Sequence, residues 1–368
     1  VALAGAREPL TDILIGEVVR GEAAQEAGII GRPERATRLT AALVNGAAGH
    51  ALDFDDTHTT MIGHPSGPVL PALLALGETE GAGGQALLAA LVAGVELECR
   101  VGTLLGGMHY AAGFHTTGTV GTFGAAAACA HLLGLDREGW LHALGLAGTQ
   151  AAGLKSAFGT MAKPLHAGRA ASAGLLSALL ARGGFTSQRA ILEVSQGFLA
   201  THAGGEASSE VLARYADRFL IRETLFKYHA ACHLTHASIE AAGQLRERHG
   251  LDREKIRAVE VRVAPPLLDV CNIEEPKTGL EGKFSLRATT ALALLGDDTS
   301  DLSTYSEAKM AEPRLIALRD RVRVIATEGI GPMQARVRIE TDGRHAETEA
   351  DIGVPAGDLD TRGERLRR

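Results

Sequence analysis

The twelve residues from Asp53 to His64 hold the side chains of this chain that are best suited to acid–base chemistry. They include three carboxylates, three hydroxyls and two imidazoles, and they follow an alanine- and glycine-rich segment, 39–52, that has helical spacing. Burying so many polar groups costs free energy unless they are paired or used. Such a cluster is therefore a candidate functional site.

Two kinds of role are open to these residues. If Asp53, Asp56 and Thr57 lie on a helix end, their i, i+3, i+4 spacing places them on one helical face. We assign Asp53, Thr57 and His64 to substrate anchoring and proton transfer. For Asp55 and His58 we favour structural roles, as a capping carboxylate and as a histidine bonded to the backbone.

A second group of polar residues stands at the start of a predicted helix. His115, Thr116 and Thr117 occupy this position. A helix N-terminus exposes unpaired amides that favour anions, so a substrate carboxylate can dock there. Thr117 can also simply cap the helix, and the two roles are compatible.

A lysine forms the third candidate. Because a proline disfavours helical backbone in the residue before it, Lys163, which precedes Pro164, is predicted to be extended and aimed. A lysine in so apolar a context more often snorkels to water than takes part in catalysis. The residue pattern alone leaves both roles open.

The fourth group lies where a second domain is predicted to begin. It contains Lys227, His233 and His236. A site drawn from two domains would lie in the cleft between them, the usual place for small-molecule binding. Its lysines and histidines suit a substrate with more than one carboxylate. The chain has no glycine-rich phosphate loop, nucleophile elbow or His-Glu-x-x-His motif, which excludes several enzyme classes.

Composition and charge restrict the partners further. The 368 residues exceed the size at which one hydrophobic core stops growing, so two domains are expected. A net charge of −7, with no basic cluster before 365–368, argues against nucleic acid and favours a small-molecule partner. Four widely spaced cysteines without a Cys-x-x-Cys pair indicate neither disulfides nor a metal site.

The same features indicate a cytoplasmic protein. The most apolar stretch, 120–135, is too short and too weakly hydrophobic to span a membrane. No signal peptide is visible. Because the chain opens on Val1 without a methionine, we expect that its natural N-terminus is missing.

Hydrophobic spacing divides the chain into a helical part and a mixed part. Residues 1–218 are predicted to form an all-helical domain without strands, and Ser187 is predicted to cap a short helix. Residues 219–355 are predicted to form a smaller α+β lid domain, and 356–368 to return toward the first domain. Helices are expected at 39–52, 69–76, 84–105, 117–133, 137–152, 167–181, 235–249 and 284–295, and strands at 255–264, 321–326, 335–340 and the run up to 352.

The motifs together resemble the MmgE/PrpD superfamily, which includes 2-methylcitrate dehydratase, cis-aconitate decarboxylase and iminodisuccinate epimerase. The similarity spans nearly the whole chain. The motifs that carry it are Asn45-Gly46, Asp53-Phe54-Asp55-Asp56-Thr57, His64-Pro65-Ser66, Gly113-Phe114-His115, Gly159-Thr160-Met161 with Lys163-Pro164, and Lys283-Phe284-Ser285.

The resemblance implies a helical domain with a lid-like α+β domain, a homodimer, and no cofactor. Enzymes of this family form or quench a carbanion-like centre beside a carboxylate. We expect His115 to be the leading general acid or base, with His64 as second proton carrier. The predicted catalytic residues are His115, His64, Lys163, Asp53 and Thr57, and the predicted substrate-binding residues are Lys227, His233, His236, Tyr110 and Thr116.

The sequence thus predicts a hydro-lyase, similar to 2-methylcitrate dehydratase, that acts on a small di- or tricarboxylate. Epimerisation of the iminodisuccinate type and decarboxylation of the cis-aconitate type are the alternatives. Ala288 stands where the dehydratase and the decarboxylase carry a tyrosine, so an inactive family member is a further alternative. An isoprenoid synthase is disfavoured, because Thr59 occupies a position where its magnesium-binding motif needs an aspartate.

Overall fold

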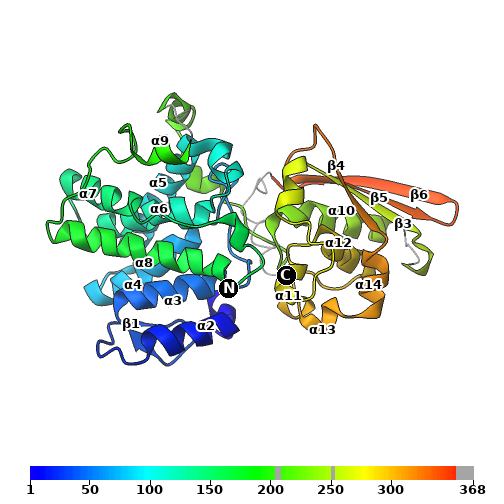
Figure 1. Cartoon of the computed structure of the whole chain (residues 1–368), viewed down its shortest axis with the longest axis horizontal. Helices are drawn as coiled ribbons and strands as arrows, with labels where there is room; N and C mark the ends of the chain where they lie inside the picture. The colour runs from blue at the N-terminus through cyan, green and yellow to red at the C-terminus, as the bar shows by residue number, and fades with distance from the viewer. Residues whose placement is uncertain (204–208, 250–252, 354–368) are drawn as a thin grey trace. The chain divides into compact units, whose positions relative to one another are not determined.

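The computed structural model describes residues 1–203, 209–249 and 253–353, and these residues pack as two units (Figure 1). The helical unit comprises the described residues of Val1–Ala51 and Asp55–Leu225, and the sheet unit comprises Leu52–Phe54 and the described residues from Phe226 to Gly353. The predicted fold class, a helical N-terminal part followed by an α+β part, is confirmed. The predicted return segment, 356–368, lies outside the described residues.

The helical unit is built around α6 (Thr116–Leu132), in which every residue from Thr116 to Ala130 is buried. This helix packs against α4, α5, α7 and α8. The other α-helices of the unit are α1 (Ala2–Gly5), α2 (Pro9–Leu14), α3 (Arg38–His50), α4 (Ser66–Glu80), α5 (Gly84–Ala111), α7 (Arg137–Gly148), α8 (Ala162–Arg182) and α9 (Phe198–His202).

Glycines allow the helix backbones to approach one another closely. Where α3 meets α8, a Cβ added at Gly46 would lie 2.7 Å from the Cα of Gly168. Where α6 meets α8, a Cβ added at Gly174 would lie 2.6 Å from the backbone nitrogen of Ala126. Real Cβ atoms do not approach backbone so closely, so both crossings require glycine.

Several local predictions for the helical unit are wrong. Asp53 and Thr57 are not on a helix, because α3 ends at His50 and the chain then runs irregularly to Pro65. Lys163 is not extended, because α8 already begins at Ala162 and a proline is tolerated in the first helical turn. Two short strands, β1 (Ala27–Gly28) and β2 (Arg35–Ala36), also interrupt the helices.

The segment around Ser187 also differs from its prediction. No helix begins there, and the Ser187 hydroxyl instead donates to the carbonyl of His142 at 2.8 Å. Helix α7 ends at Gly148 rather than near residue 152. Helix α5 continues to Ala111 past its predicted end, but Gly106 interrupts it with φ 58° and ψ −167°.

The sheet unit contains four strands in the order β4-β3-β5-β6. Strand β3 (Ala258–Val263) is parallel to β4 (Val322–Ala326) and antiparallel to β5 (Gln334–Thr341), which forms a hairpin with β6 (Arg344–Asp351). Valines 259, 261 and 263 alternate with half-buried residues, as the period-two pattern predicts.

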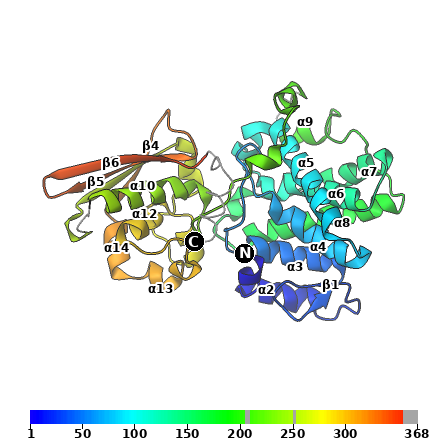
Figure 2. The same ribbon diagram turned by 180° about the vertical axis from the view of Figure 1, so that it is seen from behind.

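Helices cover this sheet. Helix α10 (His233–His249) packs against β5 and β6, and α12 (Leu286–Leu295) packs against α10 and β4. Both views show α10 and α12 lying side by side along the strands (Figures 1 and 2). Short helices complete the unit: α11 (Gly279–Gly282), α13 (Glu307–Met310) and α14 (Pro313–Arg319).

Among the described residues, none of the helices combines the length and the apolar character that crossing a bilayer requires.

A glycine-to-alanine pair tests the close helix packing. We expect Gly46→Ala to lower the free energy of unfolding by about 1–3 kcal/mol, because its Cβ would collide with the backbone of α8. Gly49→Ala is the matched control in the same helix, because a Cβ there meets nothing within 4 Å. It should be neutral or stabilising by about 0.4–1 kcal/mol. Equal melting temperatures for the two variants would contradict the packing argument.

Candidate active site

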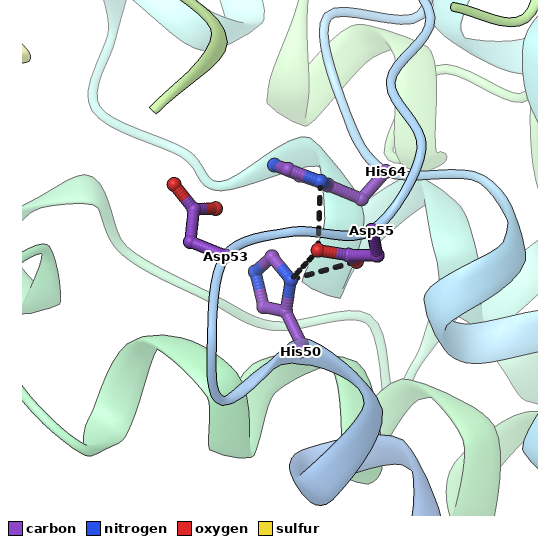
Figure 3. A group of neighbouring side chains, drawn as sticks. All are labelled: His50, Asp53, Asp55 and His64. Carbon is purple, nitrogen blue, oxygen red and sulfur yellow. Dashed lines mark hydrogen bonds and ion pairs between the residues drawn. The ribbon is translucent and has the colours of Figure 1, made fainter. Parts of the chain in front are cut away.

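The centre of the candidate site is a carboxylate shared by two imidazoles. Nδ1 of His50 lies 2.8 Å and 3.0 Å from the two carboxylate oxygens of Asp55. Nδ1 of His64 lies 3.4 Å from Oδ1 of the same residue. Figure 3 shows Asp55 held between the two rings, with His50 at the end of α3 and His64 on the loop before α4. Asp53, also labelled there, belongs to the sheet unit.

Two further helix ends bring charged or titratable groups to this cluster. His115 precedes the first residue of α6, and its ring centroid lies 5.8 Å from that of His50. Nδ1 of His115 is 3.0 Å from Nδ1 of His166, which α8 supplies. Lys163, the second residue of α8, lies over the ring of Phe158 with its Nζ 5.3 Å from the centroid.

Lys163 does not snorkel to water, since its exposed fraction is only 4%. Its charge reaches the neighbouring imidazoles, because it lowers the pKa of His50, His115 and His166. The three predicted residues His64, His115 and Lys163 therefore lie together in the helical unit.

Burial sets the protonation of these groups. Burial lowers the pKa of His50 to about 4, although Asp55 opposes this shift. Burial, followed by the charge of Lys163, holds the pKa of His115 well below its usual value. Burial alone would raise the pKa of Asp55, but its electrostatic interactions and hydrogen bonds with His50 and His64 outweigh burial and keep the pKa well below the usual value. At neutral pH Asp55 is an anion, while His50 and His115 are neutral.

Hydrogen bonds fix the loop that carries His64. The backbone N–H of His64 donates to the Thr117 hydroxyl at 3.1 Å, and the Thr116 hydroxyl donates to the carbonyl of Ile62. Thr57 forms a two-way backbone bridge with Leu225, with both N···O distances 2.8 Å. Thr116 and Thr117 thus hold the loop, and the predicted docking of a carboxylate by Thr116 stays a prediction.

Tyr110 and His58 have partners away from the shared carboxylate. Tyr110 is covered by Lys155, whose Nζ lies 4.1 Å from the ring centroid and donates to the Tyr110 carbonyl at 3.1 Å. For His58, Nε2 lies 2.9 Å from the carbonyl oxygen of Leu220, and Nδ1 accepts from the N–H of Met61. The structural role predicted for His58 is confirmed.

In the sheet unit, two lysines hold the segment Leu52–Phe54. Nζ of Lys227 lies 3.2 Å from Oδ1 of Asp53 and donates to the Asp53 carbonyl at 2.5 Å. Nζ of Lys283 donates to the carbonyl of Leu52 at 2.6 Å. Asp53 has φ 50°, an unusual backbone conformation that these contacts stabilise. Lys227 thus has the carboxylate of Asp53 as a partner, and its predicted role in clamping substrate carboxylates stays a prediction.

The remaining predicted residues stack at the start of α10. The rings of His233 and His236 have centroids 4.8 Å apart. Nε2 of His236 lies 3.3 Å from the carbonyl oxygen of Ala231, and burial holds the pKa of His236 well below its usual value. His229 contacts the ring of His236 with centroids 4.9 Å apart and pairs with Glu240. His236 is thus tied to the backbone, and the substrate-binding roles of His233 and His236 stay predictions.

Sequence reasoning missed His50 and misjudged Asp55. Asp55 does not cap a helix, because its carboxylate accepts from His50 and contacts His64. His50 lies five residues before Asp55. This spacing does not predict a contact between the two side chains, which meet only because the chain turns back after α3. The motif that contains Asp55 indicated the segment that carries this cluster, but it did not indicate His50 as the hydrogen-bond partner of Asp55.

The cluster of His50, Asp55 and His64 has side chains of the kinds that can bind a divalent cation. In the described part of the chain, ligand atoms of His50, Asp55 and His64 lie within 4.8 Å of one another. However, the hydrogen bond between His50 and Asp55 already occupies Nδ1 and engages both carboxylate oxygens. We therefore assign the group to hydrogen bonding.

Two more carboxylates are buried in the helical unit. Glu98 on α5 is fully buried, and neither of its side-chain oxygens has a hydrogen-bond partner in the described structure. Burial, followed by the charge of Asp56, raises the pKa of Glu98 well above its usual value. Burial also raises the pKa of Asp56 to about 6, even though Ser66 donates to it. Glu98 is therefore a neutral acid at neutral pH.

Comparisons with known proteins agree with these motifs. The MmgE/PrpD N-terminal domain matches residues 1–211, and the MmgE/PrpD C-terminal domain matches residues 229–364. A cis-aconitate decarboxylase of Homo sapiens is 32% identical over 314 residues, covering 80% of this chain and 63% of the human protein. One of Aspergillus terreus is 30% identical over 385 residues, covering 97% of this chain and 78% of that protein.

A third relative is the cis-aconitate decarboxylase of Mus musculus. It is 30% identical over 315 residues, covering 80% of this chain and 62% of the mouse protein. The chain thus spans less than two thirds of the length of the two mammalian relatives.

The charge of Lys163 can be measured through its histidine neighbours. We expect Lys163→Met to raise the pKa of His50 and His115, because it removes a positive charge that disfavours their protonated forms. Imidazole NMR titration of the full chain measures both. Lys155→Met is the control, since its ammonium is engaged by Tyr110. Unchanged histidine titrations in Lys163→Met would show that the ammonium is not beside these rings.

The buried acid Glu98 makes stability depend on pH. Unfolded Glu98 ionises near pH 4.5, whereas the folded form stays protonated, so its contribution is complete below that pH and is lost as pH rises. Glu98→Gln should therefore melt like the parent near about pH 5 but at a higher temperature near about pH 8. Glu138→Gln, at an exposed ion pair, is the control. A Glu98→Gln variant whose melting temperature falls with pH as steeply as that of the parent would refute the assignment.

Proposed function

Since the chain belongs to the MmgE/PrpD family, we propose that it is a lyase that decarboxylates a small tricarboxylate of the cis-aconitate type without a cofactor. The matched relatives are named as cis-aconitate decarboxylases. They favour decarboxylation over the dehydration that the sequence alone suggested.

The observation that carries the proposal is a buried ammonium among buried neutral imidazoles. Lys163 is 4% exposed, and its charge acts on both His50 and His115. The N-termini of α6 and α8 add the positive ends of two long helices. A site of this kind attracts an anion and holds groups that can carry a proton.

The reaction needs two kinds of assistance. The carbon–carbon bond to one carboxylate breaks and carbon dioxide leaves. The electron pair passes into the adjacent unsaturated system, and a protonated group then delivers a proton to carbon. Lys163 would stabilise negative charge on a remaining carboxylate, and a fixed cation of this kind typically contributes about 10²- to 10³-fold in rate.

The proton would come from an imidazole. His115 is the leading candidate, because it stands at the N-terminus of α6 and contacts both Phe158 and His166. A bound polycarboxylate places negative charge beside the ring and raises its pKa, which favours the protonated, donating form. His64 is the second proton carrier. Asp53 and Lys227 of the sheet unit stay predicted site residues.

Product analysis in deuterated water tests the proposal. The full chain is incubated separately with cis-aconitate, 2-methylcitrate and iminodisuccinate and followed by proton NMR. Decarboxylation predicts release of carbon dioxide from cis-aconitate and one carbon-bound deuterium in the product. Net loss of water from 2-methylcitrate would instead establish a dehydratase, and α-proton exchange in iminodisuccinate an epimerase.

Lys163→Met supplies the matched variant. We expect kcat/KM to fall by about 10²-fold or more with little change in melting temperature. Lys277→Met is the control, because its side chain is 73% exposed. A folded parent that neither converts nor exchanges any of the three substrates would contradict the proposed function.

A further inference from the structure

We infer that His50 is a proton-transfer residue of this site, exchanging a proton with the bound carboxylate substrate through Nε2 while Asp55 holds the ring through Nδ1. The inference rests on the proposed function and adds a residue outside the set predicted from the sequence. It stands on the geometry of the end of α3.

The tautomer of His50 follows from its partner. Both oxygens of Asp55 lie within 3.0 Å of Nδ1. An ionised carboxylate can only accept hydrogen bonds, so Nδ1 must carry the proton. A neutral imidazole has one N–H and one lone pair, and the lone pair of His50 is therefore on Nε2.

That lone pair is buried and unused. The side chain of His50 has no exposed surface, and in the described structure Nε2 has no hydrogen-bond partner. Leaving a buried acceptor without a partner is energetically unfavourable. A substrate that gives or takes a proton at Nε2 would remove this cost in the complex.

The surroundings of the ring fit a carboxylate substrate. His50 lies against His64 with ring centroids 4.4 Å apart and beside His115 at 5.8 Å. Lys163 acts on the same ring through its charge. The three imidazoles and the ammonium of Lys163 thus lie close together in the helical unit.

Asp55 is a positioning residue in this arrangement. It fixes the His50 tautomer, contacts Nδ1 of His64 at 3.4 Å, and would stabilise an imidazolium at either ring. Carboxylate–imidazole pairs of this kind orient a catalytic histidine without themselves being protonated.

The proton transfer balances in both directions. In decarboxylation, His50 can serve as a proton donor alongside His115: protonated His50 gives its Nε2 proton to the carbon that receives the electron pair, becomes neutral, and is reprotonated from water. In exchange, the neutral ring takes a proton from the carbon next to a carboxylate, so that the N–H bond forms as the C–H bond breaks.

Two substitutions separate this role from a structural one. His50→Asn retains an N–H close to the position of Nδ1 that can still bond Asp55, but it has no group at the position of Nε2. We expect kcat/KM and solvent deuterium exchange to fall by about 10²-fold or more while the melting temperature changes little. His131→Asn, at an exposed histidine of α6, is the control.

Asp55→Asn tests the positioning role. Removing the carboxylate removes a charge that raises the pKa of His50, so the pH profile of kcat/KM should move to lower pH. A purely structural Asp55 would lower stability without moving this profile. Wild-type activity in His50→Asn, or an unmoved profile in Asp55→Asn, would overturn the inference.

A measurement independent of turnover separates this inference from the proposed function. Nitrogen NMR of the parent imidazoles should show protonated Nδ1 and unprotonated Nε2 for His50 at neutral pH. The Nε2 resonance should shift on addition of cis-aconitate or citrate. Binding with this shift but without turnover would refute only the decarboxylation, whereas an Nε2-protonated tautomer or an unshifted resonance would refute the role of His50.

Discussion

Close contact between the backbones of α3, α6 and α8 is the constraint on which the candidate site depends. The side chains of the cluster come from helix ends: His50 closes α3, His115 precedes α6, and Lys163 opens α8. These helix ends meet because glycines, which have no side chain, let the helix backbones approach closely where the helices cross. A larger residue at Gly46 or Gly174 would push the helix axes apart, and the side chains at their ends would move with them.

This packing also determines the electrostatics of the site. Two helix N-termini and the ammonium of Lys163 make the region positive, and burial removes the water that would screen it. Burial, followed by the charge of Lys163, disfavours protonation of the imidazoles there and accounts for the low pKa values of His50 and His115. Asp55 is the exception, since its negative charge is held by His50 and His64. The helical unit thus holds neutral proton carriers in a field that favours an anion.

In the sheet unit, buried lysines are paired with a carboxylate or with a backbone carbonyl. Lys227 and Asp53 form a buried pair, and Lys283 binds a carbonyl of the adjacent residue Leu52. Removing one member would leave an uncompensated buried charge, which is strongly destabilising. Three residues of the motif segment, 52–54, are therefore anchored to the sheet unit, while the rest of that segment belongs to the helical unit. The positive φ of Asp53 marks this change of direction.

The sequence by itself determined the division into helical and mixed parts, because hydrophobic periodicity is a local property that each segment carries. It also predicted 53–64, His115 and Lys163 as candidate site residues, because each of these motifs consists of contiguous residues. Only the tertiary structure decided that His50 shares Asp55 with His64, that Thr116 holds a loop, and that Lys227 binds Asp53. These pairings depend on how the chain turns after α3 and on how closely the helices approach. Both are set by contacts between residues far apart in the sequence, which no local pattern records.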